Sequence, residues 1–230
     1  MVSVKHYIGY DDRERDACTV AVKSLLRVSP QADITLLDID QLAAQGLLRR
    51  PVDKRGPMYD FMSNANASTD FAISRFLVPI ICQQGWAMFT DCDVVFLADP
   101  HELLRQVNPS KAVYVVKHRY IPKEGIKMDG QIQTIYSKKN WSSVMLFNCD
   151  HPANRRLSLV DVNERRGLDL HQFYWLHESE IGELPAEWNW LVGVQPKPDA
   201  PKLAHFTLGG PWLPTWKQSE HDELWWEASR

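Results

Sequence analysis

Cysteine is scarce in this sequence and forms no recognisable motif. The four cysteines are scattered along the 230 residues without a Cys-x-x-Cys pair, at Cys18, Cys82, Cys92 and Cys149. Structural zinc sites are usually built from closely spaced cysteines and histidines, so this pattern argues against structural zinc. Unpaired thiols are typical of a reducing compartment, and we therefore expect a cytoplasmic protein.

Long apolar runs and a large net charge are also missing. No stretch approaches the roughly 18–20 apolar residues of a membrane-spanning helix, and the first residues lack the apolar segment of a signal peptide. We therefore expect no membrane span. The net charge is only −3, so no global field would attract nucleic acid or an anionic membrane. Mild acidity in particular argues against strong duplex binding.

The beginning of the sequence has the pattern of a βαβ unit. Residues 2–10 are typical of a strand, residues 16–28 place apolar side chains at helical spacing, and residues 34–39 are again strand-like. Short connections of this kind favour a parallel sheet with a right-handed crossover, which predicts an α/β fold. A hydrophobic fraction of 44% in 230 residues suffices for one good core and is marginal for two domains.

The turn after the first strand contains Gly9, Tyr10 and Asp11. Ligands of parallel α/β sheets bind beyond the carboxyl ends of the strands, so these residues are expected at the mouth of a site. An ordinary strand-to-helix turn explains the same three residues equally well.

Two carboxylates interrupt the apolar run from Trp86 to Leu97. The run is rich in β-branched and aromatic residues and predicts a buried strand, in which Asp91 and Asp93 point to the same side. Buried carboxylates need compensation, and two of them side by side suit a hard divalent cation. The Asp-x-Asp pair therefore predicts a metal site.

Arg75 is the only charged residue between Phe71 and Cys82. It is either a buried ion-pair partner or a group that reaches a carboxylate or phosphate with its planar fork. The preceding stretch, residues 47–66, is basic, contains proline and glycine, and has no clear periodicity. It predicts a surface loop, either fully solvated or acting as a lid over a site.

Five short motifs occur in one order along the chain: IGYD at 8–11, SRFLVP at 74–79, DCD at 91–93, NWSS at 140–143 and HFTLGGPW at 205–212. This ordered set resembles glycosyltransferases of the GT-A fold, close to glycosyltransferase family 8 and to small bacterial and phage members. The resemblance implies one Rossmann-like α/β domain over residues 1–230, with a mixed, mainly parallel central sheet flanked by helices. About residues 1–100 would bind the nucleotide and about residues 101–230 the acceptor.

The resemblance also implies roles for individual residues. The implied metal ligands, for Mn²⁺ or Mg²⁺, are Asp91, Asp93 and His205. The implied nucleotide-sugar contacts are Gly9, Tyr10, Asp11, Arg75, Cys92 and Gly209, with Arg75 near the diphosphate. Asp93 and Asp169 are the implied catalytic residues, Asp169 facing the donor sugar.

Three departures from the family pattern stand out. The lysine that usually precedes the final Pro-Trp is replaced by Gly210, so a cation for the diphosphate must come from Arg75, Lys117, Arg119 or Lys127, or be absent. The family's Asn-Ser-Gly-Val is replaced by residues 141–144 (WSSV), and its second Asp-x-Asp by residues 169–171 (DLH).

The function expected from these observations is metal-dependent transfer of a hexose from a nucleotide diphosphate sugar, with UDP as the expected nucleotide. The enzyme would be a hexosyltransferase of class EC 2.4 that retains anomeric configuration, and its acceptor would be a saccharide, a protein or another molecule. Asp129 and Gln131 are candidate acceptor contacts or parts of a solvated turn. Two alternatives stay open: a metal-dependent nucleotidyl- or phosphotransferase, and a non-catalytic sugar-nucleotide-binding protein. The oligomeric state is left open.

Overall fold

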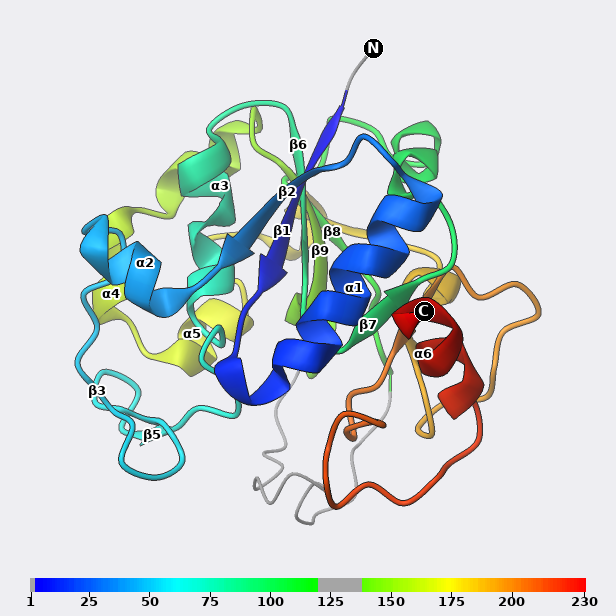
Figure 1. Ribbon diagram of the computed structural model, residues 1–230. Coiled ribbons are helices and arrows are strands. Elements are labelled where there is room, and N and C mark those ends of the chain that lie inside the picture. Colours follow the sequence, from blue (N-terminus) through cyan, green and yellow to red (C-terminus); the bar gives the residue numbers. More distant parts are fainter. Residues whose placement is uncertain (1–2, 120–137) are drawn as a thin grey trace.

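The computed structural model describes residues 3–119 and 138–230 (Figure 1). Its helices are α1 (Arg15–Val28), α2 (Ile39–Ala44), α3 (Val78–Cys82), α4 (Leu159–Glu164), α5 (Gly167–His171) and α6 (Asp222–Ser229). Its strands are β1 (Val4–Gly9), β2 (Asp33–Leu37), β3 (Val52–Asp53), β4 (Tyr59–Asp60), β5 (Ala65–Asn66), β6 (Trp86–Thr90), β7 (Val94–Phe96), β8 (Val113–Val115), β9 (Val144–Asn148), β10 (Ile181–Glu183), β11 (Trp190–Leu191) and β12 (Leu203–His205).

A six-stranded sheet in the order β10-β8-β9-β6-β1-β2 forms the centre of the molecule. The pairs β1–β2, β1–β6 and β8–β10 are parallel, whereas β9 runs antiparallel to both of its neighbours. The predicted α/β fold with a mixed, mainly parallel sheet is therefore confirmed. Because β1 and β6 are adjacent and parallel, their carboxyl ends meet at one edge of the sheet, where β9 begins.

Helices cover both faces of this sheet (Figure 1). On one side α1 packs against β7 and α6, and on the other side α3 contacts β6 and β9. The main core lies between these layers and the sheet, and a second cluster around Trp190, Phe206 and Trp225 lies under α6. This second cluster, with Trp212 packed against it, contains three of the seven tryptophans that follow residue 170.

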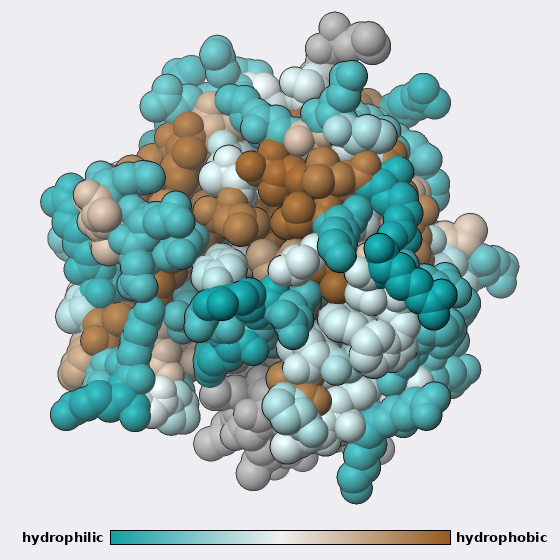
Figure 2. All heavy atoms as spheres, viewed as in Figure 1, coloured by the Kyte–Doolittle hydropathy of each residue, from teal (hydrophilic) through white to brown (hydrophobic). Residues whose placement is uncertain are grey.

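The edge strand β2 leaves an apolar surface beside α1. Figure 2 shows apolar atoms gathered on this face. Leu26 of α1 and Leu36 of β2 are exposed, with exposed fractions of 40% and 39%. No helix in the described ranges is long and apolar enough to cross a membrane.

The predicted single strand around Asp91 and Asp93 is wrong in one respect. The run forms two strands in different sheets, because β6 belongs to the central sheet while β7 pairs with β12 in a three-stranded sheet with β11. Asp91, Cys92 and Asp93 form the connection between them, outside regular strand structure. The continuous apolar pattern hides this break because both strands are buried.

The basic stretch predicted as a surface loop contains a small antiparallel sheet, β3-β4-β5. Arg50, which precedes this sheet, forms an ion pair with Asp60 of β4, and the two side chains are only 2% and 3% exposed. The Arg50 guanidinium also donates to the carbonyl oxygens of Val162 and Arg165, at 2.9 and 2.7 Å. Arg50 thus fastens the small sheet to α4 and the segment after it.

Removing Arg50 is expected to be far more costly than removing an exposed arginine of the same sheet. Arg50→Ala leaves the Asp60 carboxylate buried without its partner, and we expect a loss of about 3–5 kcal/mol in the free energy of unfolding. Arg55→Ala is the matched control, because Arg55 pairs with Asp53 at 90% exposure and its loss should change the free energy of unfolding little. Urea titration measures both; equal effects would contradict a fastening role for Arg50.

Candidate functional site

A cavity of about 630 Å³ opens at the edge of the sheet where β1 and β6 end. This volume lies in the range of about 300–1,000 Å³ typical of small-molecule sites. Its walls come from the β3–β5 region, the segment before α3, the connection after β6, the turn before β9, the start of α5 and the segment after β12. The titratable residues among its lining are Glu14, Asp60, Arg75, Asp91, Asp93, Lys139, Arg166 and His171.

The three predicted metal ligands come together beside this cavity, which Asp91 and Asp93 line and His205 does not. One carboxylate oxygen each from Asp91 and Asp93 and one ring nitrogen of His205 lie within 4.8 Å of one another. Two carboxylates and an imidazole form a donor set compatible with Mn²⁺, and the half-buried carboxylates face a cavity rather than open solvent. The residues present therefore fit a divalent cation.

Arg75 holds Asp91 in place. Its Nη1 lies 2.8 Å from Asp91 Oδ1, and the two side chains are 6% and 16% exposed. The same nitrogen donates to the carbonyl oxygen of Ser142 at 2.8 Å, and the guanidinium lies over the Phe71 and Phe89 rings, 5.3 and 5.0 Å from their centroids. Of the two readings of Arg75, the structure shows the buried ion pair, whose carboxylate is the candidate metal ligand itself.

His205 takes the corresponding place beside Asp93. Its Nε2 lies 3.2 Å from Asp93 Oδ1, and its Nδ1 lies 2.9 Å from the Oδ1 of Asn189. The amide of Asn189 in turn donates to the Ser143 hydroxyl, which donates to the carbonyl of Asn140. Asn189 is fully buried, and no local sequence signal linked it to the site.

The turn Trp141–Ser143 before β9 joins these parts. The Ser143 carbonyl accepts the Asp91 N–H at 2.9 Å, and the Ser142 hydroxyl lies 2.7 Å from His171 Nδ1. Both serines are 3% exposed. Ser142 matches the serine of the family's Asn-Ser-Gly-Val pattern, whereas Ser143 stands in place of its glycine and adds a hydroxyl that accepts from Asn189.

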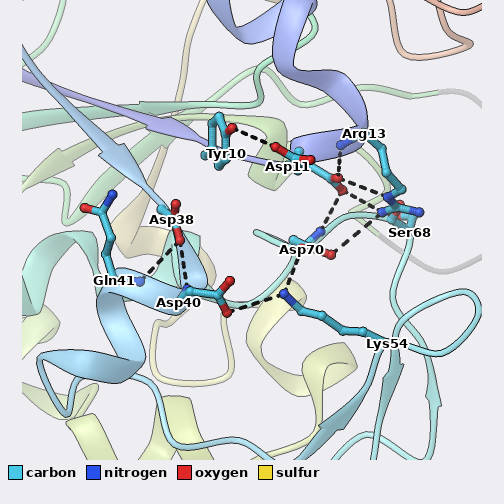
Figure 3. Close-up of polar contacts among 10 residues, drawn as sticks. Tyr10, Asp11, Arg13, Asp38, Asp40, Gln41, Lys54, Ser68 and Asp70 are labelled. Carbon is cyan, nitrogen blue, oxygen red and sulfur yellow. Dashed lines mark hydrogen bonds and ion pairs between the residues drawn. The ribbon is translucent and has the colours of Figure 1, made fainter.

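The predicted nucleotide contacts after β1 lie beside the cavity, outside its lining. Asp11 is buried, and its carboxylate accepts from the Arg13 guanidinium, with Nη2 at 2.6 Å, and from the backbone N–H of Asp70 at 3.0 Å (Figure 3). Lys54 joins this network, because its Nζ lies 3.2 Å from the Asp70 carboxylate. The network braces the segment before α3, of which residues 66–69 line the cavity.

Gly9 and Tyr10 complete this region. A Cβ at Gly9 would lie 2.3 Å from the ring of Phe71, so the close packing of that ring needs glycine here. The Tyr10 hydroxyl donates to Asp12 at 3.1 Å. The structure thus shows packing and bracing roles for residues 9–11, and their contact with a nucleotide stays a prediction.

Glu14 is a cavity residue that the sequence patterns did not reveal. It accepts the thiol hydrogen of Cys92 at 3.2 Å, and Cys92 is fully buried, so that thiol faces the protein interior. Burial, followed by the negative charge of Asp93, raises the pKa of the Glu14 carboxyl to about 8. Burial likewise raises the pKa of the Cys92 thiol well above its usual range.

His171 and Gly209 line the cavity, whereas Asp169 does not. Asp169 pairs with Arg166 through oxygen–nitrogen distances of 3.2 and 3.3 Å. His171, two positions later on this short helix, points inward; burial, and then the Arg75 charge, hold its pKa well below the usual range. The catalytic role of Asp169 stays a prediction.

Of the described cations expected near the diphosphate, Arg75, Lys117 and Arg119, only Arg75 lines the cavity. Arg75 is committed to Asp91, Lys117 lies 5.5 Å from the Trp141 ring centroid, and Arg119 is exposed. Lys127, Asp129 and Gln131 lie outside the described residues. Two cations that were not predicted, Lys139 and Arg166, line the cavity.

No protein-family model matches this sequence. A curated relative does: the chain is 43% identical over 226 residues to the Arabidopsis thaliana protein named Protein CDI, and the match covers 95% of this chain and 83% of that protein.

Solved glycosyltransferase structures share the fold. The Streptococcus pneumoniae TIGR4 glycosyltransferase GlyE superposes with a TM-score of 0.60 at 14% identity, covering 100% of this chain and 60% of that one. The galactosyltransferase LgtC, in complex with donor and acceptor sugar analogues, gives 0.55 at 15%, covering 98% and 95%. The bifunctional WbbM gives 0.56 at 16%, covering 89% and 46%, so the chain spans about half of WbbM and three fifths of GlyE. The fold is therefore that of GT-A glycosyltransferases.

The raised pKa of Glu14 predicts a pH-dependent stability. Because its pKa is about 8 in the folded protein and 4.5 ordinarily, folding favours the neutral carboxyl, and this contribution is present below about pH 4.5 and lost as the pH rises through 8. In metal-free buffer, Glu14→Gln should match the wild type near pH 4 and exceed its melting temperature at pH 8, by about 2–4 °C for each kcal/mol.

The exposed Glu183 on β10 provides the control, since Glu183→Gln should change the melting temperature little at either pH. A melting difference between Glu14→Gln and wild type that does not vary between pH 4 and pH 8 would contradict the burial argument.

Proposed function

We propose that this chain, which belongs to the family of the Arabidopsis thaliana Protein CDI, is a metal-dependent glycosyltransferase. It transfers a hexose from a nucleotide diphosphate sugar, with UDP as the nucleotide, to an acceptor with retention of configuration. Residues of the first half, about 1–100, bind the donor, and residues of about 101–230 bind the acceptor.

The observation that carries the proposal is the position of the acid pair. Asp91 and Asp93 follow β6 at the carboxyl edge of the sheet, meet His205 within 4.8 Å, and face a cavity of about 630 Å³. The fold shared with GlyE and LgtC supports sugar transfer over the nucleotidyl- and phosphotransferase alternative, because those neighbours are glycosyltransferases.

Each residue of the site has a chemical task. Asp91, Asp93 and His205 would hold Mn²⁺ or Mg²⁺, and the bound ion would supply Lewis-acid stabilisation of the negative charge on the departing nucleotide diphosphate. Arg75 orients Asp91, because its guanidinium already contacts that carboxylate at 2.8 Å. The backbone at Cys92 and Gly209, and Tyr10 and Asp11 at the rim, complete the donor site.

Lys139 and Arg166 replace the missing family lysine. Both line the cavity that contains the acid pair, whereas Gly210 stands where the family has its cation. Positive charge at this position neutralises diphosphate oxygens and fixes the donor in the cavity. His171, held by Ser142, lies on the same wall and orients the donor sugar.

The proposal predicts metal-dependent release of UDP. Wild-type protein incubated with UDP-sugars, Mn²⁺ and an acceptor panel should release UDP, and Asp93→Ala should lower the rate at least about 100-fold, because several kcal/mol of leaving-group stabilisation are lost. Asp33→Ala is the control, since Asp33 is exposed at the opposite end of the sheet.

The products separate the rival functions. Release of pyrophosphate or phosphate instead of UDP would indicate nucleotidyl- or phosphotransfer. Calorimetric binding of UDP without turnover on any acceptor would indicate a non-catalytic binding protein. UDP release that is equal in wild type and Asp93→Ala would contradict the metal assignment.

Asp169 gives a separate test of the active-site geometry. Because Asp169 does not line the cavity, Asp169→Asn should retain transfer within about threefold, a change of less than 1 kcal/mol. His171→Ala should lose more. A large loss of turnover in Asp169→Asn with Mn²⁺ binding intact would instead support the catalytic role that the sequence predicts.

A further inference from the structure

A chain of hydrogen bonds leads from His205 through Asn189 and Ser143 to the carbonyl oxygen of Asn140, and that last oxygen determines which atom donates at each step. The carbonyl oxygen of Asn140 can only accept, so the Ser143 hydroxyl, 2.7 Å away, must donate its hydrogen to it. The lone pairs of the Ser143 oxygen then remain to accept from Asn189, whose amide nitrogen lies 2.9 Å away. The Asn189 amide is thereby oriented with its NH₂ group toward Ser143.

This orientation fixes what His205 encounters. With its NH₂ group on Ser143, Asn189 turns its carbonyl oxygen to His205 Nδ1 at 2.9 Å. A carbonyl oxygen needs a donor, so the Nδ1 atom bears the ring proton. The other ring nitrogen, Nε2, lies 3.2 Å from Asp93 Oδ1, and in the neutral ring it directs its lone pair to that side.

We propose that Asn189 is a positioning residue for the metal site: it holds His205 in the tautomer with the proton on Nδ1 and so presents Nε2 as a ligand. This inference rests on the proposed function. A lone pair facing a carboxylate oxygen is unfavourable by itself, and a cation between the two atoms makes the arrangement favourable. Asn189 would therefore act on the metal site through His205, although Asn189 itself does not line the cavity.

Burial makes the arrangement rigid. Asn189 is 0% exposed, His205 1% and Ser143 3%, so little water reaches the amide to replace either of its hydrogen bonds. Rotating the amide would turn its oxygen toward Ser143, whose single hydroxyl hydrogen would then face two acceptors, the Asn189 and Asn140 oxygens, and one of them would lose its donor. Ligand histidines generally depend on such an acceptor, whose loss typically weakens metal binding about 10–100-fold.

The experiment is calorimetric titration of Mn²⁺ into the full chain, with Asn189→Leu, Asn189→Asp and Asn154→Ala as variants. Asn189→Leu keeps the branched shape of the side chain but cannot accept from Nδ1, and we expect about 10–100-fold weaker Mn²⁺ binding. Asn189→Asp keeps an acceptor at that place, and we expect an affinity within about threefold of wild type. A merely structural role predicts the reverse order, because a buried carboxylate destabilises the fold more than leucine does.

Asn154 is the matched control, since it is also a buried asparagine, 5% exposed, but its amide donates to the carbonyls of Ala112 and Asn148 away from the site. Asn154→Ala should leave Mn²⁺ affinity unchanged, and an equal loss there would overturn the inference. If Asn189→Leu does not fold, Ser143→Ala tests the same chain, with a loss of about threefold or more expected; unchanged affinity in either variant would overturn it.

Failure of the inference and failure of the proposed function give different results. If the wild type itself does not bind Mn²⁺, the metal site of the proposed function fails. If the wild type binds Mn²⁺ and Asn189→Leu binds it equally well, the metal site stands and the role of Asn189 is overturned.

Discussion

The site depends on two carboxylates, Asp91 and Asp93, that lie close together and are largely buried. Asp91 and Asp93 are 16% and 13% exposed, and neither charge would be stable there without compensation. Arg75 compensates the first and His205 faces the second. Since these partners come from segments more than 100 residues apart, the acid pair ties the two halves of the sequence together.

The turn before β9 fixes the positions of the side chains that surround the acid pair. The carbonyl oxygen of Ser142 accepts from the Arg75 guanidinium, and the carbonyl oxygen of Ser143 accepts from the Asp91 backbone N–H. Through its hydroxyls, the same turn contacts His171 and Asn189. The turn is placed by the antiparallel strand β9, whose Val144 pairs with Thr90 directly before the acid pair. A single reversed strand in a mainly parallel sheet thus brings a second set of donors and acceptors to the edge where parallel strands end.

Much of the fold could be predicted because its signals are local. Apolar periodicity and short connections gave the βαβ unit, observed as β1, α1 and β2, and the order of motifs predicted an α/β fold of the GT-A kind. The break between β6 and β7 could not be seen, because both strands are buried and the apolar run is continuous. The β3–β5 sheet escaped as well, since its stability depends on the distant contacts of Arg50.

The site was partly predictable because some of its residues lie in local sequence motifs. Residue types with metal chemistry, Asp91, Asp93 and His205, were found by their motifs, and the structure brings them together. Glu14 and Asn189 were missed because helix starts and buried amides have no spacing pattern of their own. The inward-facing residue of the DLH motif is His171 rather than Asp169, which depends on the rotation of α5, and a five-residue helix gives too little periodicity to determine it.

Crystals soaked with Mn²⁺ and UDP test the central claim most directly, through the anomalous signal of the metal. We predict one manganese peak bound by Asp91, Asp93 and Nε2 of His205, with the UDP diphosphate on its open side and the Arg75–Asp91 contact retained. A peak elsewhere, or UDP bound in the cavity with no metal between it and the acid pair, would contradict the proposed site.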